Sequence, residues 1–306
     1  MLRFLGFIGG AAAIGMAGAL FQDAPAPKPP PDSAVPAAAG SKRVELDVAY
    51  AADDKAQRLD FYRPEKDGYA TVVFVYGGGW HSGSGRSCAP IAEKLARLGF
   101  GCALVSHRLS PPHVWPAHAE DVASAFAWTH AHVAERGGDP KRIFLVGHSS
   151  GAQLSLLLST DESWLAAHDL SPDDVAGVVG LSPPVDLEPH QTGKSFGDTL
   201  MAGRGADAFS RDAAVMKDAS PIHHLSASLP RCLLVAGEND FPMLPGDVAA
   251  FAAKAKELGA DARTLITKGR DHMGVVAALL EEGSDVEKSA LEFLRAGVTA
   301  SGGARP

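Results

Sequence analysis

Short apolar segments recur along the chain between residues 44 and 297, and longer segments with helical spacing of apolar residues separate them. The short segments are rich in Val, Leu, Ile and Phe, as in "TVVFVY", "RIFLVGH" and "VAGVVGLS". This length and content predict strands that are buried on both faces. The predicted strands cover residues 58–63, 71–76, 101–108, 142–148, 175–182 and 231–237.

The segments between these strands predict helices at residues 90–98, 117–136, 152–159, 246–258, 275–282 and 286–296. Buried strands that alternate with helices are typical of a parallel sheet covered by helices on both faces. We therefore expect one α/β domain over residues 44–297. Residues 190–220 are polar, irregular and Gly-rich in part, so we expect a small lid or cap there.

The first 43 residues differ from the rest of the chain. A single arginine, Arg3, precedes an uncharged run over residues 4–22, and "AGA" at 17–19 offers the small residues that a signal peptidase reads. We expect a secretory signal peptide at 1–19, a Pro/Ala-rich linker at 20–43 and a flexible tail at 298–306. The protein would then be periplasmic or secreted. The alternative is an uncleaved membrane anchor, the only case in which we expect a membrane contact.

Composition excludes several classes of protein. The chain has 306 residues, 46% of them hydrophobic, which is enough for a sizeable core. The net charge is −8 and no basic block is present, so nucleic acid is not an expected partner. Three cysteines do not form a disulfide framework, and no Cys/His/Asp/Glu spacing is typical of a metal site. We expect no cofactor and no metal, and the oligomeric state stays open.

A glycine-rich loop, "VYGGGWHSGSG" at residues 75–85, follows one predicted strand. Dinucleotide sites, phosphate loops and oxyanion holes all use bare backbone of this kind. In a dinucleotide fingerprint that starts at Gly77, the last glycine position falls on Ser82. A phosphate loop needs a lysine, and none lies between Lys66 and Lys94. The remaining interpretation is an oxyanion hole, which requires a nucleophile elsewhere.

A nucleophile is predicted in "IFLVGHSSGAQLSLLL", where G-x-S-x-G lies between an apolar strand and an apolar helix. In that context Ser149 occupies a tight turn with its hydroxyl exposed above the sheet. Its activation needs a histidine, and the histidine needs a carboxylate. We expect backbone N–H groups of Gly78, Gly79 and Ser150 to form the oxyanion hole. Trp80 is predicted as a wall of the acyl pocket, with core packing as the alternative.

The histidine and the acid follow from chain order, which runs serine, acid, histidine in this class of site. Asp240 lies in the loop after the last predicted strand, and His272 lies in a loop before a helix. We therefore assign Asp240 and His272, with Glu238 as the reserve acid. Asp271 is less favoured, because a sequence neighbour rarely orients its own histidine.

Four stretches together carry a resemblance to a known family: "VYGGGWHSGS", the segment from "VSHRLSPPHVWPAHAEDV" through "GHSSGAQLSLLL", "ASPIHHL" and "LLVAGENDFP". The chain resembles the α/β-hydrolase esterases of the hormone-sensitive-lipase-like group, and within them the branch of kynurenine formamidases and feruloyl/acetyl-xylan esterases. The resemblance implies the α/β-hydrolase fold. It also matches Arg108 and Asp121 to an ion pair beneath the site, for which separate surface charges are the alternative.

The resemblance and the residues lead to one functional hypothesis: a serine carboxylesterase for small or aromatic carboxylic esters. The alternatives are an arylformamidase and a non-catalytic binding module with the same fold. The sequence departs from the family at two positions. Tyr76 stands where the family usually has histidine before its glycines, and His107 stands where it has tyrosine.

Overall fold

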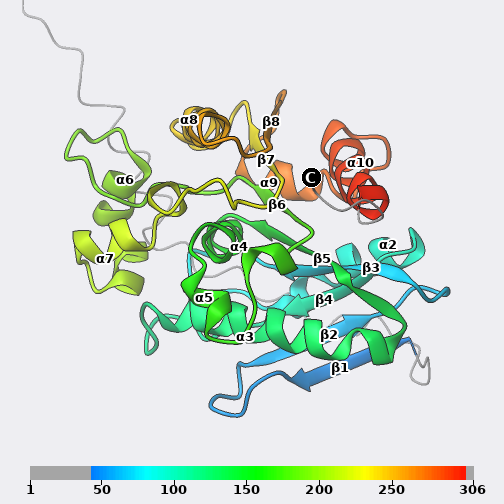
Figure 1. Ribbon diagram of the computed structural model, residues 1–306. Helices are drawn as coiled ribbons and strands as arrows, with labels where there is room; N and C mark the ends of the chain where they lie inside the picture. Colours follow the sequence, from blue (N-terminus) through cyan, green and yellow to red (C-terminus); the bar gives the residue numbers. More distant parts are fainter. Residues whose placement is uncertain (1–42, 301–306) are drawn as a thin grey trace, which may run out of the picture.

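The computed structural model describes residues 43–300. Its centre is an eight-stranded sheet with the strand order β1-β2-β4-β3-β5-β6-β7-β8 (Figure 1). The strands are β1 (Val44–Ala49), β2 (Arg58–Tyr62), β3 (Tyr69–Val75), β4 (Gly101–Val105), β5 (Gly138–His148), β6 (Gly177–Leu181), β7 (Cys232–Gly237) and β8 (Ala262–Thr267).

The sheet is mostly parallel. All neighbours from β4 to β8 pair in parallel, with Val73 of β3 opposite Ala103 on one side and Leu145 on the other. Strands β1 and β2 are antiparallel to their neighbours. The six predicted strands are confirmed with ends shifted by a few residues. The two edge strands β1 and β8 were not predicted, because their exposed residues interrupt any apolar run.

Helices cover both faces of this sheet. The α-helices are α2 (Ala89–Arg97), α3 (Ala117–His132), α4 (Ser150–Thr160), α5 (Ser163–Ala166), α6 (Phe196–Ala202), α7 (Ala213–Asp218), α8 (Leu244–Glu257), α9 (His272–Ala277) and α10 (Asp285–Ala300). Short 3₁₀ turns are η1 (Gly85–Cys88), η2 (Ala134–Arg136), η3 (Pro172–Asp174), η4 (Arg204–Phe209) and η5 (Pro221–His223).

Two apolar clusters hold the helices on the sheet. One cluster joins α3, α4, α5 and α8 to one face, and the other joins α2, α9 and α10 to the opposite face (Figure 1). Successive residues of a strand point to opposite faces, so Val73 and Val75 enter the first cluster while Val72 and Phe74 enter the second. Burial on both sides explains why the central strands read as continuous apolar runs.

The segment predicted as an irregular lid is more regular than expected. Residues 190–220 contain α6, η4 and α7, and their apolar side chains Leu200, Phe209 and Met216 are buried in the first cluster. Ser195 and Asp198 form a capping box at the start of α6. We call residues 196–220 the cap segment, since this packing joins it to the core.

Several predictions concern the ends of the chain. The predicted signal peptide and linker lie outside the described residues and stay predictions. At the other end, α10 continues to Ala300 and so includes residues assigned to the tail. Among residues 43–300, no helix has the length and apolar content needed to cross a membrane.

Candidate active site

The residues singled out by the sequence meet at the carboxyl edge of the sheet. The glycine-rich loop follows β3, Ser149 follows β5, Asp240 follows β7, and His272 follows β8 as the first residue of α9. In parallel α/β sheets, ligands bind at this edge, because the loops that leave neighbouring strands converge there.

Ser149 sits in a strained turn between β5 and α4. Its φ is 53° and its ψ is −122°, a conformation that costs a non-glycine residue about 1–3 kcal/mol. Its N–H donates to the Leu181 carbonyl at 2.8 Å, which ties the turn to β6. A Cβ on Gly151 would overlap the carbonyl oxygens of Val75 and Tyr76, so the motif needs glycine there. The turn presents the hydroxyl of Ser149 at the start of α4.

A chain of two hydrogen bonds links Ser149, His272 and Asp240. His272 Nε2 lies 2.9 Å from Ser149 Oγ, and His272 Nδ1 lies 2.7 Å from Asp240 Oδ1. A carboxylate only accepts hydrogen bonds, so Nδ1 carries the hydrogen and Nε2 keeps its lone pair for the serine hydroxyl. The Asp240 side chain is fully buried and that of His272 is partly exposed. A buried anion therefore supports a histidine that faces the serine.

Asp240 is held by four donors. Oδ2 accepts from Ser182 Oγ at 2.5 Å and from the Gly237 N–H at 3.2 Å, and Oδ1 accepts from the Phe241 N–H at 2.9 Å as well as from His272. Burial by itself raises the pKa of the Asp240 carboxyl, but the hydrogen bonds from His272 and Ser182 outweigh it and hold that pKa below its usual value. Sequence reasoning missed Ser182.

The alternative acids have other partners. Glu238 Oε2 accepts from the Gly269 N–H at 2.9 Å, and Asp271 Oδ1 accepts from the Gly274 N–H at 2.7 Å at the start of α9. Asp240 is the carboxylate that the structure brings to His272.

The predicted oxyanion donors occupy different situations. The N–H of Ser150 has no partner inside α4, because it is the first helical residue. Within the described part of the chain, the Gly79 N–H has no hydrogen-bond partner. The Gly78 N–H instead donates to Ser150 Oγ at 3.1 Å. A Cβ on Gly78 would overlap the Ser82 backbone, so this position requires glycine.

The structure does not support Trp80 as a wall of the acyl pocket. Only 2% of this residue is exposed, and its ring packs edge-on against Phe209 of η4 at 4.9 Å between ring centroids. Its indole N–H donates to Gln153 Oε1 at 3.0 Å. Trp80 therefore packs in the core, the alternative reading of the sequence. The prediction of an acyl-pocket wall failed because Trp80 is covered by Phe209, which lies so far away along the chain that the sequence alone does not place the two side by side.

His148, directly before the serine, is a further residue that sequence reasoning did not place. Its Nε2 donates to the backbone carbonyl of His272 at 3.1 Å, and the two rings lie 4.9 Å apart. Burial, together with the nearby His272 ring, lowers the pKa of His148 to about 4. His148 is therefore neutral at neutral pH, and it supports the backbone of His272 without adding charge.

The two departures from the family pattern meet in one contact. The rings of Tyr76 and His107 are stacked, with centroids 4.8 Å apart and planes 6° from parallel. Burial lowers the pKa of His107, so its ring is neutral at neutral pH. Tyr76 directly precedes the three glycines and His107 follows β4, so the stacked pair joins the glycine-rich loop to the segment after β4.

Arg108 and Asp121 form the expected ion pair. Asp121 is fully buried and accepts from the Arg108 backbone N–H at 2.7 Å and from its Nε at 2.9 Å. Gln57 Nε2 donates to the same carboxylate at 2.8 Å. The pair joins the loop after β4 to α3.

We expect Arg108→Met to lower the free energy of unfolding by about 3 kcal/mol, because it leaves the buried Asp121 carboxylate without its cation. Urea denaturation measures the change. Arg263→Met is the matched control, since Arg263 pairs with Asp261 on the surface with both side chains more than half exposed. Equal losses in the two variants would contradict the assigned role of the pair.

Two other features lie apart from the reacting groups. Oxygen and nitrogen atoms of Asp186, Glu188 and His223 lie within 4.8 Å of one another, although the sequence shows no metal-ligand spacing. His223 Nε2 already lies 3.7 Å from Asp186 Oδ1 and 3.4 Å from Glu188 Oε2, and Lys217 pairs with Glu188.

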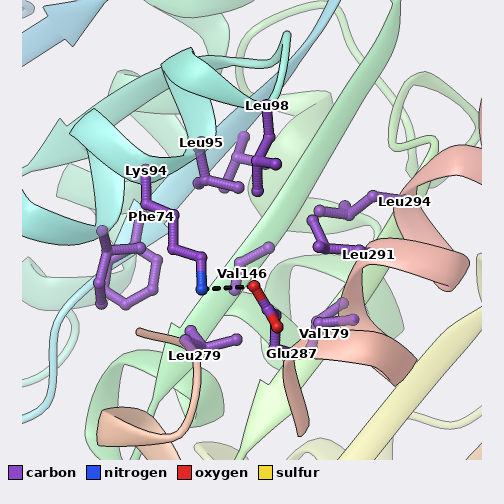
Figure 2. Close-up of a pocket in the computed structure, with 13 residues that line it drawn as sticks. Phe74, Lys94, Leu95, Leu98, Val146, Val179, Leu279, Glu287, Leu291 and Leu294 are labelled. Atoms are coloured by element: carbon purple, nitrogen blue, oxygen red, sulfur yellow. Dashed lines mark ion pairs between the residues drawn. The ribbon is translucent and has the colours of Figure 1, made fainter. Parts of the chain in front are cut away.

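An apolar pocket lies between α2, α10 and the sheet, where Lys94 and Glu287 face each other as an ion pair (Figure 2). Its volume of about 30 Å³ is far below the roughly 300–1,000 Å³ of typical small-molecule sites. No residue of the Ser149 hydrogen-bond chain lines this pocket.

The fold and the site together define a class. A serine at a strand-to-helix turn, a histidine and a buried aspartate at the carboxyl edge of a mostly parallel sheet form the arrangement of the α/β-hydrolases. Within that class, the chain belongs to the BD-FAE family, whose model matches residues 59–255.

Two of the curated relatives are proteins of Mycobacterium tuberculosis. The probable carboxylic ester hydrolase LipM is 33% identical over 204 residues, which cover 63% of this chain and 47% of LipM. Esterase LipC is 33% identical over 202 residues, which cover 61% of this chain and 49% of LipC. The chain spans about half the length of the curated relatives it matches.

Solved structures confirm the fold class. A truncated carbohydrate esterase from gut microbiota superposes with a TM-score of 0.71 at 22% identity, covering 84% of this chain and 96% of that one. Esterase B from Lactobacillus rhamnosis superposes with a TM-score of 0.71 at 21% identity, covering 84% and 87%. The predicted resemblance to α/β-hydrolase esterases is confirmed.

Proposed function

We propose that this protein is a serine carboxylesterase that hydrolyses small or aromatic carboxylic esters through an acyl-enzyme. The observation that carries the proposal is the hydrogen-bond chain from Ser149 through His272 to Asp240. Beside it lie the backbone N–H groups of Gly79 and Ser150, which have no hydrogen-bond partner within residues 43–300. The relatives LipM and LipC are described as ester hydrolases, which favours an ester over other acyl compounds.

The first half of the reaction forms the acyl-enzyme. Ser149 Oγ attacks the ester carbonyl carbon while its proton moves to His272 Nε2, and Asp240 stabilises the resulting imidazolium. The carbonyl oxygen becomes negatively charged and accepts from backbone N–H groups at Gly79 and Ser150. Each such donor is worth about 3–4 kcal/mol in the transition state. His272 then gives its proton to the leaving alcohol as the bond to the carbonyl carbon breaks.

The second half repeats these steps with water. His272 takes a proton from a water molecule, whose oxygen attacks the acyl carbon and displaces Ser149 Oγ. The proton returns to Ser149, and the free acid leaves. The Gly78 N–H becomes a third donor when the Ser150 hydroxyl turns away from it.

A substrate panel tests this proposal. The purified protein is assayed with p-nitrophenyl acetate, p-nitrophenyl butyrate, methyl ferulate and N-formylkynurenine, and labelled with a fluorophosphonate probe. We expect covalent labelling and kcat/KM values for at least one ester above that for the formamide. A preference for the formamide would instead identify an arylformamidase. Absence of both labelling and turnover in folded protein would identify a non-catalytic binding module.

A further inference from the structure

Gln153 is a fully buried polar residue that the proposed reaction does not use. It lies on α4, one helical turn after Ser149. Its Oε1 accepts from Trp80 Nε1 at 3.0 Å, and its Nε2 donates to the Ala219 carbonyl at 2.7 Å. A buried amide is tolerated when both of its ends are satisfied, and here each end is satisfied by a different segment.

The first of these segments is the glycine-rich loop. Trp80 directly follows Gly79, whose N–H is a predicted oxyanion donor. Gly79 and Trp80 both have a left-handed backbone, with φ values of 60° and 65°. This conformation is unfavourable for tryptophan, so surrounding contacts must hold it. The bond to Gln153 is one such contact, and the Trp80 carbonyl accepts from the Ser110 N–H at 2.9 Å as another.

The second segment is the cap segment. Ala219 is fully buried directly after α7, and Phe209 of the same segment packs against the Trp80 ring. Ser220 beside it accepts from the Leu187 N–H at 2.7 Å, which fixes this end of the cap segment to the loop after β6. The cap segment is therefore joined to Trp80 in two ways. Phe209 packs directly against the Trp80 ring, and Gln153 bridges Trp80 to Ala219 by hydrogen bonds.

We propose that Gln153 is a positioning residue. It holds the glycine-rich loop in the conformation that places the Gly79 N–H as an oxyanion donor, and it couples this loop to the cap segment. The side chain does not touch the reacting atoms and acts through Trp80 on Gly79. The inference rests on the proposed function, because an oxyanion donor matters only if acyl transfer occurs. A donor displaced by about 1 Å loses much of its effect on the transition state while substrate binding is hardly changed.

The test compares kinetics and inhibition in Gln153→Leu. We expect kcat for p-nitrophenyl butyrate to fall about 10- to 100-fold, with KM within about 2-fold of the parent value. A trifluoromethyl ketone forms a negatively charged tetrahedral adduct with an active-site serine. Its inhibition constant is expected to rise in proportion to the loss in kcat/KM, because both report the oxyanion donors.

Two further variants keep the test decisive. Ser159→Ala removes a buried hydroxyl from the same helix, whose Oγ donates only to Ser155 O, and it should leave kcat unchanged. Trp80→Phe keeps an aromatic ring but removes the N–H, so it should lower kcat in the same direction even if Gln153→Leu folds poorly. The double variant Gln153→Leu/Trp80→Phe should be no worse than the more severe single change, because both break one contact.

Three results would overturn the inference. The first is a kcat in Gln153→Leu and Trp80→Phe that matches Ser159→Ala per folded molecule. The second is a rise in KM at constant kcat, and the third is an unchanged inhibition constant for the ketone. Failure of the proposed function looks different, since the parent protein would then hydrolyse none of the substrates and would not be labelled by the fluorophosphonate.

Discussion

Replacing Ser149 by alanine is expected to lower kcat for p-nitrophenyl acetate by about 10⁴- to 10⁶-fold. The reason is that no other oxygen nucleophile lies at the hydrogen-bond distance of 2.9 Å from His272 Nε2 among the described residues. Residual hydrolysis would come from water activated by the histidine and from the backbone donors. The midpoint of thermal unfolding should change little, because alanine and serine are strained to the same degree by the backbone conformation at position 149, where φ is 53°.

The measurement combines turnover with covalent labelling. A fluorophosphonate probe should label the parent protein once and leave Ser149→Ala unlabelled. Ser228→Ala is a suitable control, because Ser228 is exposed and its hydroxyl forms a hydrogen bond with that of Ser226, away from the triad. Persistent labelling and turnover in Ser149→Ala would show that another residue is the nucleophile.

The second large effect is expected for Asp240→Asn, with a loss in kcat of about 10³- to 10⁴-fold. All four partners of the Asp240 carboxylate are donors, so an amide NH₂ in either orientation faces an N–H or O–H group. If the NH₂ turns toward His272, it donates to Nδ1 and moves the ring hydrogen to Nε2. The histidine then has no lone pair to take the serine proton.

A pH series on stability accompanies this variant. The pKa of Asp240 is lowered in the folded protein, so its carboxylate adds stability above the ordinary carboxyl pKa of about 3.9. That contribution is lost only as the pH falls through the lower folded value. The stability difference between parent and Asp240→Asn should therefore persist at neutral pH and shrink in strong acid.

Glu238→Gln is the matched control for the acid. Glu238 accepts from the Gly269 N–H on the surface, so its amide should keep activity within a few-fold of the parent protein. A large loss in Glu238→Gln together with an active Asp240→Asn would reverse the assignment of the acid.

The central strands were predictable because they are buried on both faces and so carry unbroken apolar runs. The edge strands β1 and β8 were not, since exposed residues alternate irregularly in them. Helices α6 and α7 have seven and six residues, which is too short for a clear helical period. Their stability comes from packing into the core, and that packing is set by distant parts of the chain.

The reacting residues were predictable for a different reason. Ser149, Asp240 and His272 each occupy a loop directly after a predicted strand or before a helix, and their order along the chain is informative. The residues that support them carry no such local signal. Ser182 meets Asp240 across 58 positions of sequence, and His148 meets the His272 carbonyl across 124. Only the folded sheet brings these groups together.

The stacking of Tyr76 on His107 links the two positions at which this sequence departs from the family pattern. A position-by-position comparison scores them as two separate mismatches, one in the glycine-rich loop and one after β4. In the folded chain the two residues form one contact, because the phenol ring of Tyr76 stacks on the imidazole ring of His107 with centroids 4.8 Å apart. The contact ties the start of the glycine-rich loop to the segment after β4, so replacing either ring alone would leave the other without its stacking partner.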